Sequence, residues 1–257
     1  MQQQTSREIP PAQAVHLAPH ELVVGSYNLH KAVGRDMRRD PSRTIEVIRE
    51  MGADVVALQE VDRRFGARSG VLDLQALHAR TGLAPVPFPE RLGHAAHGWH
   101  GNLLLFRGAE VERVLPITLP GLEPRGALVA DLRVAGHPLR VIGAHLGLLK
   151  QSRLQQARRL AEEIGADDDR PTIVMGDLNE WRLGAKCSLM PLRKRLSAVK
   201  RSALTVPSFP AHMPVLPLDR IIGCKRSEVV ELARHDTELS RMASDHLPLV
   251  ARLRLGG

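Results

Sequence analysis

The chain has 257 residues, 43% of them hydrophobic, and its 36 basic and 28 acidic side chains give a formal net charge of +8. It contains no internal repeat or low-complexity tract, and its longest apolar run is far shorter than the roughly 18 residues that a membrane-spanning helix needs. This composition excludes a membrane-spanning chain and is typical of a globular protein whose excess positive charge attracts polyanions.

The N-terminal segment differs in composition from the rest of the chain. Residues 1–20 include three consecutive glutamines and two consecutive prolines, and they lack the apolar centre of a signal peptide. We therefore expect a disordered leader over residues 1–20, a single domain over residues 21–257 and a cytoplasmic location. Cys187 and Cys224 match no metal-binding spacing, so we expect two free thiols.

Apolar runs along the chain end repeatedly in polar residues, which is typical of buried strands whose ends face solvent or a ligand. Residues 171–176 are the clearest case, because the run closes on glycine and is followed by Asp177 and Asn179. Alternate residues of an extended chain point the same way, so these two side chains are expected to face one site, although Asp-x-Asn also favours tight turns. Similar runs end in Asn28, Glu60 and His145. Asp219 lies within another such run, and Asp245 and His246 precede one.

Helical patterns alternate with these runs. Asp40 and Pro41 form a cap and first-turn pair, and the apolar residues that follow predict a helix that Gly52 ends. Residues 151–164 show apolar positions at helical spacing and are followed by Gly165, so we expect a second helix there with Leu154, Ala157, Ala161 and Ile164 on its inner face. Two neighbouring runs between residues 127 and 144 are joined by a tight turn at residues 135–138, which indicates mixed rather than purely parallel sheets.

Eight short motifs occur in an order that resembles the endonuclease/exonuclease/phosphatase superfamily, which includes deoxyribonuclease I, abasic-site endonucleases, sphingomyelinases and inositol polyphosphate phosphatases. They extend over most of the chain and are Tyr27-Asn28, Leu58-Gln59-Glu60-Val61, Gly101-Asn102-Leu103-Leu104, Pro124-Arg125-Gly126-Ala127, Ala144-His145-Leu146, Gly176-Asp177-Leu178-Asn179, Leu218-Asp219-Arg220-Ile221 and Ser244-Asp245-His246. The resemblance is to the bacterial metal-dependent hydrolase branch. It implies an α/β fold of the deoxyribonuclease I type, a four-layer αββα sandwich of two packed mixed β-sheets flanked by helices.

The resemblance also implies a metal site. The residue that matches Glu60 is the principal metal ligand in the family, with those matching Asn28 and Asp245 close by. Carboxylate oxygens suit Mg²⁺, which usually keeps several waters and uses one or two protein carboxylates, and Mn²⁺ is the expected substitute. Taken alone, Glu60 could equally be an acid that caps the loop after a strand.

The remaining motif residues are expected to carry the chemistry. By resemblance, Asp219 supports His246 as a base, and an imidazole with a carboxylate on its second nitrogen is suited to that role. Asp177 orients or deprotonates the attacking water, and either Asp177 or His246 takes the proton. His145 is expected to contact a phosphoryl oxygen or protonate the leaving group, and phosphate binding falls to Arg125, Asn102, Asn179 and His145. Deoxyribonuclease I has an acid before the Asn102 strand that supports the first histidine, whereas this chain has His100 and Gly101, so His145 needs another partner.

These features predict a divalent-metal-dependent phosphoesterase that hydrolyses a phosphodiester, with an endonuclease or exonuclease among the possibilities. The segment from Arg182 to Arg201 contains many lysines and arginines and no acid, so it is either a solvated basic surface or a contact for nucleic acid or anionic lipid. Seven aromatic residues (one Tyr, two Trp and four Phe) are too few for a dedicated single-strand binder.

We slightly favour nucleic acid as the substrate over an anionic phospholipid or a small phosphodiester, and the phospholipid or small-molecule phosphodiesterase or phosphatase is the alternative. A second alternative is a non-catalytic basic adaptor that binds nucleic acid or a membrane. That reading predicts loss of Glu60, Asp177 or His246, all of which are present. No obligate protein partner is evident from the sequence.

Overall fold

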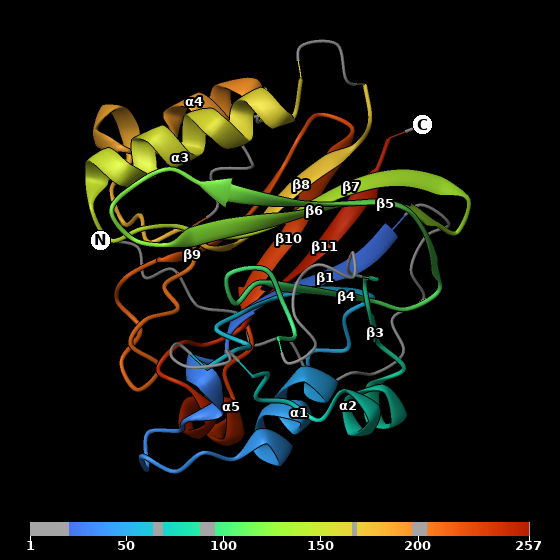
Figure 1. Ribbon diagram of the computed structural model, residues 1–257, viewed down its shortest axis with the longest axis vertical. Coiled ribbons are helices and arrows are strands. Elements are labelled where there is room, and N and C mark those ends of the chain that lie inside the picture. The colour runs from blue at the N-terminus through green and yellow to red at the C-terminus, as the bar shows by residue number, and fades with distance from the viewer. Residues whose placement is uncertain (1–20, 64–68, 88–95, 166–168, 197–204, 257) are drawn as a thin grey trace, which may run out of the picture.

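A computed structural model describes residues 21–63, 69–87, 96–165, 169–196 and 205–256 of the chain. Two β-sheets pack face to face between two layers of helices (Figure 1). The first sheet has the order β10-β11-β1-β2-β4-β3, and its strands are β1 (Glu21–Asn28), β2 (Val55–Gln59), β3 (Ala84–Pro85), β4 (Leu103–Phe106), β10 (Ser227–Arg234) and β11 (Leu249–Leu255). The second sheet has the order β5-β6-β7-β8-β9, and its strands are β5 (Ala109–Leu119), β6 (Arg125–Val134), β7 (His137–His145), β8 (Thr172–Asp177) and β9 (Asp219–Gly223).

The helices form the two outer layers. Helices α1 (Pro41–Glu50), α2 (Leu74–Thr81) and α5 (Glu238–Ala243) cover the first sheet, whereas α3 (Lys150–Glu163) and α4 (Met190–Arg195) cover the second (Figure 1). Short 3₁₀ turns, η1 (His30–Ala32) and η3 (Gly184–Lys186), lie in the connections. Both sheets are mixed, because β1 pairs parallel to β2 and β7 parallel to β8 while the other pairs are antiparallel. The predicted four-layer αββα sandwich is confirmed.

Three apolar clusters hold the layers together. One lies between the sheets and includes Val24, Leu128 and Met175, and each of the other two joins one sheet to its helices. Strands β2 and β8 are buried at every position because both of their faces are covered. This explains why they read in the sequence as continuous apolar runs and not as alternating ones.

The predicted helices form with small differences. The Asp40 side chain caps α1 by accepting a hydrogen bond from the Arg43 backbone amide at 2.9 Å, and Gly52 takes the positive φ of 60° that ends the helical run. Helix α3 begins one residue earlier than expected, and its buried face differs from the predicted one. Arg153, Gln156, Ala157 and Leu160 are buried, whereas Leu154 and Ala161 are only half-buried.

The register of the second sheet brings the polar strand ends to one edge. His145 at the end of β7 is paired with Asp177 at the end of β8, and Asp177 is paired with Asp219 at the start of β9. Parallel neighbours need close backbone approach here, since a Cβ on Gly176 would lie 1.8 Å from the Ala144 carbonyl oxygen. Glycine before Asp177 is therefore a packing requirement of this edge.

Other expectations have mixed outcomes. The β6–β7 hairpin turns at Ala135 and Gly136, both with positive φ. Strand β7 begins at His137, so the turn is shorter than the predicted one at residues 135–138. Cys187 and Cys224 are free. Among the described residues, no helix is long and apolar enough to cross a membrane. The leader at residues 1–20 and the end of the basic segment at residues 197–204 lie outside the described residues.

Candidate active site

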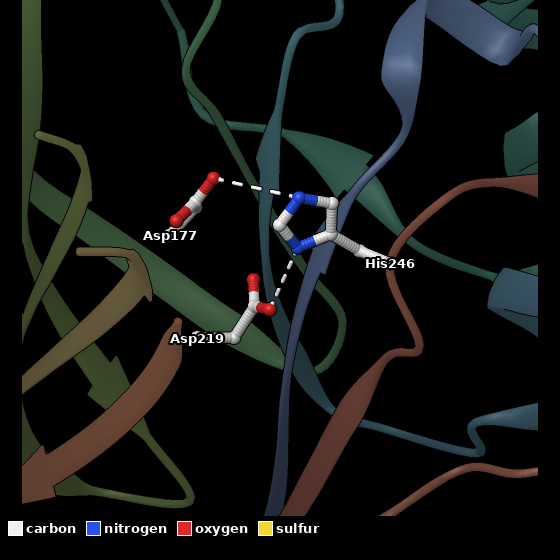
Figure 2. Close-up of side chains that lie close together, drawn as sticks. All are labelled: Asp177, Asp219 and His246. Carbon is white, nitrogen blue, oxygen red and sulfur yellow. Dashed lines mark hydrogen bonds and ion pairs between the residues drawn. The ribbon is translucent and has the colours of Figure 1, made fainter. Parts of the chain in front are cut away.

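His246 and Asp219 form a buried hydrogen-bonded pair (Figure 2). The ring Nδ1 donates to Asp219 Oδ2 at 2.8 Å, and Nε2 faces Asp177 Oδ2 at 3.8 Å. The Phe209 ring packs against the imidazole with centroids 4.8 Å apart. Burial opposes the charged ring, but the carboxylates of Asp219 and Asp177 outweigh it and raise the pKa of His246 to about 10. The pair therefore carries a protonated imidazole between two carboxylates at neutral pH.

Asp177 is the point at which the two sheets meet in the site. Its Oδ2 accepts a hydrogen bond from Asn28 Nδ2 at 3.0 Å, which links β8 to the end of β1. Its Oδ1 accepts the Asn179 backbone amide at 3.1 Å. The chain turns here, and Asn179 has a φ of 51°, so Asp177 and Asn179 do not face the same way as two residues of one strand would. Asp177-Leu178-Asn179 therefore forms a turn, and the expectation that its two polar side chains extend in one direction is not met.

His145 lies beside Asp177 and is paired with a cation. Arg125 Nη1 donates to His145 Nε2 at 2.9 Å, and the same guanidinium donates to Glu123 Oε2 at 2.8 Å through Nη2. Burial lowers the pKa of His145 to about 4, Asp177 at 3.4 Å opposes the shift, and Arg125 adds to it. The ring is therefore neutral at pH 7 with its Nε2 occupied, which does not suit the expected role of proton donor to a leaving group. Arg125 is the partner that the sequence left unidentified.

A small pocket of about 130 Å³ opens beside these residues. His145, Arg125, Glu123 and Glu60 line it, together with Lys31. Cations and carboxylates thus alternate around a space large enough for a single phosphate group.

Glu60 and Lys31 form an ion pair at this pocket, and neither side chain is fully buried. Burial opposes ionisation of Glu60, but the protonated form of His145 and the Lys31 ammonium lower the pKa of the carboxyl. His145 is neutral at pH 7, so Lys31 is the cation that keeps Glu60 ionised there. The backbone is left-handed at Glu60, with φ 58°, and at Lys31, also with φ 58°. Such strain in non-glycine residues is concentrated at functional sites.

The predicted metal ligands offer a donor set that fits a hard divalent cation. Glu60 supplies an ionised carboxylate that reaches the pocket, and Asp245 supplies a second, half-exposed one. His30 connects Asp245 to Asn28, the third predicted ligand, since its ring lies 3.9 Å from Asp245 and its backbone amide donates to Asn28 Oδ1 at 3.0 Å. The Lys31 ammonium pairs with Glu60 Oε2, so it would compete with a bound cation for this carboxylate.

A second group of oxygen and nitrogen donors lies deeper. Ligand atoms of Asp177, Asp219 and His246 all lie within 4.8 Å of one another, and Asp219 Oδ1 is buried with no hydrogen-bond partner among the described residues. In its present arrangement this group is joined by hydrogen bonds and charge, and it is distinct from the ligand set predicted from the sequence.

Two of the expected phosphate ligands direct their amides elsewhere. Asn102 is buried, and its Nδ2 donates to the carbonyl oxygens of Gly126 at 3.0 Å and Trp99 at 3.1 Å. Asn179 Nδ2 donates to the Leu146 carbonyl oxygen at 2.9 Å. In this structure these amides hold loops at the edge of the site, and neither residue lines the pocket. Phosphate contact by either would require these bonds to be exchanged.

Buried charges support the site through contacts that were not predicted from the sequence. Glu180 is fully buried and accepts from the Ser188 amide at 2.8 Å, with Arg153 at 3.7 Å. Arg153 in turn donates to the Gly147 carbonyl oxygen at 3.1 Å, and Arg220 donates to the Glu180 carbonyl oxygen at 2.6 Å. These buried charges tie the loops after β7 and β8 together. Arg220 belongs to one of the eight motifs, but no sequence pattern indicated that these charges are buried.

The sequence is similar to known proteins over most of its length. A sequence model described as the Endonuclease/Exonuclease/phosphatase family matches residues 25–246. The uncharacterized protein YbhP of Escherichia coli is 30% identical over 247 residues, which cover 89% of this chain and 94% of that protein.

Solved structures share the fold. An endonuclease/exonuclease/phosphatase from Beutenbergia cavernae superposes with a TM-score of 0.70 at 23% identity, covering 93% of this chain and 72% of that one. A mannosyl-6-phosphatase of Bacteroides thetaiotaomicron superposes with a TM-score of 0.66 at 17% identity, covering 90% and 99%. By the family match over most of its length and by its relation to YbhP, the chain belongs to the endonuclease/exonuclease/phosphatase family.

Proposed function

We propose that this protein is a divalent-metal-dependent phosphoesterase and that its preferred substrate is a phosphodiester. The observation that carries the proposal is the placement of Asp177 Oδ2, which is 3.8 Å from His246 Nε2 and 3.0 Å from Asn28 Nδ2. The first distance exceeds a direct hydrogen bond and suits a water molecule held by both groups. Attack by such a water on phosphorus breaks the bond to the leaving ester oxygen, which takes up a proton from solvent, while the proton of the attacking water passes through Asp177 to solvent.

Each polar group has a place in this step. Asp177 accepts the proton of the water, because both ring nitrogens of His246 already face carboxylates. The protonated His246 ring, held by Asp219, holds the water through Nε2, and its positive charge balances the charge that develops on the phosphate. Arg125 binds a phosphoryl oxygen, and neutral His145 orients the guanidinium.

A divalent ion would be held by Glu60, with Asn28 and Asp245 as further ligands, and when bound it would supply Lewis-acid relief of charge on the phosphate oxygens. Mg²⁺ is the expected ion and Mn²⁺ its substitute. The hard oxygen donors of this set support the assignment.

A phosphomonoester or another small phosphate ester is the second candidate. It is favoured by the size of the pocket and by the shared fold with a mannosyl-6-phosphatase. A non-catalytic adaptor is disfavoured because such a role needs no buried Asp-His pair. Among possible phosphodiesters, the net charge of +8 slightly favours nucleic acid over an anionic phospholipid or a small molecule.

The test is hydrolysis of bis-(p-nitrophenyl) phosphate and p-nitrophenyl phosphate with Mg²⁺ or Mn²⁺. We expect turnover of the diester that disappears with EDTA and returns when the ion is added back. Faster turnover of the monoester would favour the second candidate. Turnover that persists undiminished in chelator would overturn the metal-dependent mechanism.

A further inference from the structure

Five of the ten large apolar side chains that the described residues expose lie on loops at the catalytic edge of the second sheet. Leu122 lies in the β5–β6 connection, Leu148 and Leu149 follow His145 after β7, and Trp181 and Leu183 follow Asp177 after β8. We call these five residues the apolar rim, and their exposed fractions lie between 42% and 84%. Exposed apolar residues scattered singly are ordinary, whereas a group on neighbouring loops marks an interaction surface.

Hydrogen bonds and a cation–ring contact join the three loops into one surface beside the pocket. The Leu148 amide donates to Glu123 Oε1 at 2.8 Å, and Glu123 lines the pocket next to Leu122. Arg153 donates to the carbonyl oxygens of the β7–α3 loop and also lies 5.5 Å from the centre of the Trp181 ring. The rim therefore borders the entrance to the proposed phosphate site.

Positive charge accompanies the rim. Lys150 and Lys186 are exposed on the same loops, and the Arg182 guanidinium lies 4.2 Å from the centre of the Trp181 ring. The acids of these loops are already engaged, since Glu123 pairs with Arg125 and Glu180 is buried. A neighbouring segment, residues 205–218, contains no Asp, Glu, Lys or Arg and exposes Met213 and Val215.

We propose that the apolar rim docks on an anionic phospholipid bilayer and that the substrate is a phospholipid whose phosphodiester enters the pocket; this rests on the proposed phosphoesterase function. A phospholipid has an apolar body next to its phosphodiester, so it satisfies the rim and the pocket together. Leucine and tryptophan side chains stabilise binding at the bilayer interface, and lysine and arginine near the surface strengthen it on anionic lipid. A nucleic acid would leave the leucines unused, because its interfaces are polar and positively charged.

The test is cosedimentation of the full chain, in EDTA to prevent turnover, with vesicles of phosphatidylglycerol and phosphatidylcholine or of phosphatidylcholine alone. We expect binding to the anionic vesicles and at least about tenfold weaker binding for the combined Leu148→Gln, Leu149→Gln and Leu183→Gln variant. Lys150→Glu with Lys186→Glu should weaken binding similarly. The matched control, Lys225→Glu with Arg226→Glu, makes the same charge change at the opposite edge, in the β9–β10 turn, and should bind as wild type.

Turnover of bis-(p-nitrophenyl) phosphate separates this inference from the proposed function. The leucine variant should hydrolyse the soluble diester at the wild-type rate, since none of its three residues lines the pocket. If wild type hydrolyses the soluble diester but binds no vesicles, or if the leucine variant binds them undiminished, the docking inference is overturned and the phosphoesterase function stands. Displacement of the protein from vesicles by duplex DNA, with DNA cleaved in preference to phospholipid, would overturn it in favour of nucleic acid.

Discussion

His246 Nδ1 and Asp219 Oδ2 are joined by a 2.8 Å hydrogen bond although the residues come from the start of β9 and from the loop before β11. The bond sets the ring so that Nε2 points at Asp177 on the neighbouring strand β8. Ser208 donates a second hydrogen bond to the same Asp219 oxygen. The orientation of the imidazole is therefore set by the bond at Nδ1, and Nε2 faces Asp177.

Replacement of Asp219 by asparagine keeps the shape of the side chain and removes its charge. We expect kcat to fall about 10²-fold or more with little change in KM, because the ring loses the partner that holds its orientation and charge. Ser208→Ala is the matched control, since it removes a neutral bond to the same oxygen and should cost less than about tenfold. Steady-state kinetics on a phosphodiester, with thermal melting to confirm folding, measures both. Equal losses in the two variants would contradict the assignment.

Arg125 is the cation that the structure offers to a phosphate in the pocket. Arg125→Met should raise the inhibition constant of inorganic phosphate about 10- to 100-fold, because a charge-assisted, forked contact is lost. Arg125→Lys should bind phosphate more tightly than Arg125→Met but more weakly than wild type, since an ammonium cannot bond His145 and Glu123 in the same planar geometry. Arg133→Met, beside the hairpin turn at the opposite edge, serves as the control. Unchanged phosphate inhibition in Arg125→Met would remove this residue from the site.

Much of the fold follows from the sequence because both sheets are covered on both faces. Strands such as β2 and β8 must then be apolar throughout, and the polar residue at which each run stops marks the edge of a sheet. Asp177 and His145 were predictable for this reason, and the strand register places them beside Asp219 on adjacent strands.

The remaining parts of the site depend on loop geometry that no periodicity encodes. Lys31 reaches Glu60 because three consecutive residues, His30 to Ala32, have positive φ. The amide of Asn102 could have faced a phosphate as readily as a backbone carbonyl, and only the folded loop decides between them. The burial of Arg153 and Gln156 on the inner face of α3 was not predicted, because charge and amide groups normally mark an exposed helix face.

Lys31 is expected to compete with a divalent cation for Glu60. Lys31→Met should raise the affinity for Mn²⁺ about two- to fivefold, because the ion no longer displaces an ammonium from a partly exposed carboxylate. Glu60→Gln should weaken Mn²⁺ binding strongly, and Lys150→Met, on the β7–α3 side, should leave it unchanged. Isothermal titration calorimetry on the metal-free protein measures all three. Weaker binding in Lys31→Met would show that the lysine supports the ion instead of competing with it.

Glu180 provides a test of the buried charges that hold the site loops. Burial works against its ionised form, but hydrogen bonds from Ser188 and Arg182 and the charge of Arg153 outweigh it, so the pKa of Glu180 lies below its ordinary value of 4.5. A carboxyl whose pKa is lower in the folded state stabilises the fold above its unfolded pKa. That contribution is lost as the pH falls through the folded value.

Glu180→Gln should therefore unfold more easily in urea at neutral pH, by about 3–5 kcal/mol, since Arg153 is left as an uncompensated buried charge. The difference between variant and wild type should begin to narrow once the pH drops below 4.5, and it should be lost as the pH falls through the lower pKa of the folded wild-type carboxyl. Glu162→Gln, on the last turn of α3, changes the same charge with no buried partner and should show neither effect. A stability difference for Glu180→Gln that stays constant from pH 7 to well below 4.5 would mean that the side chain acts through its shape and not its charge.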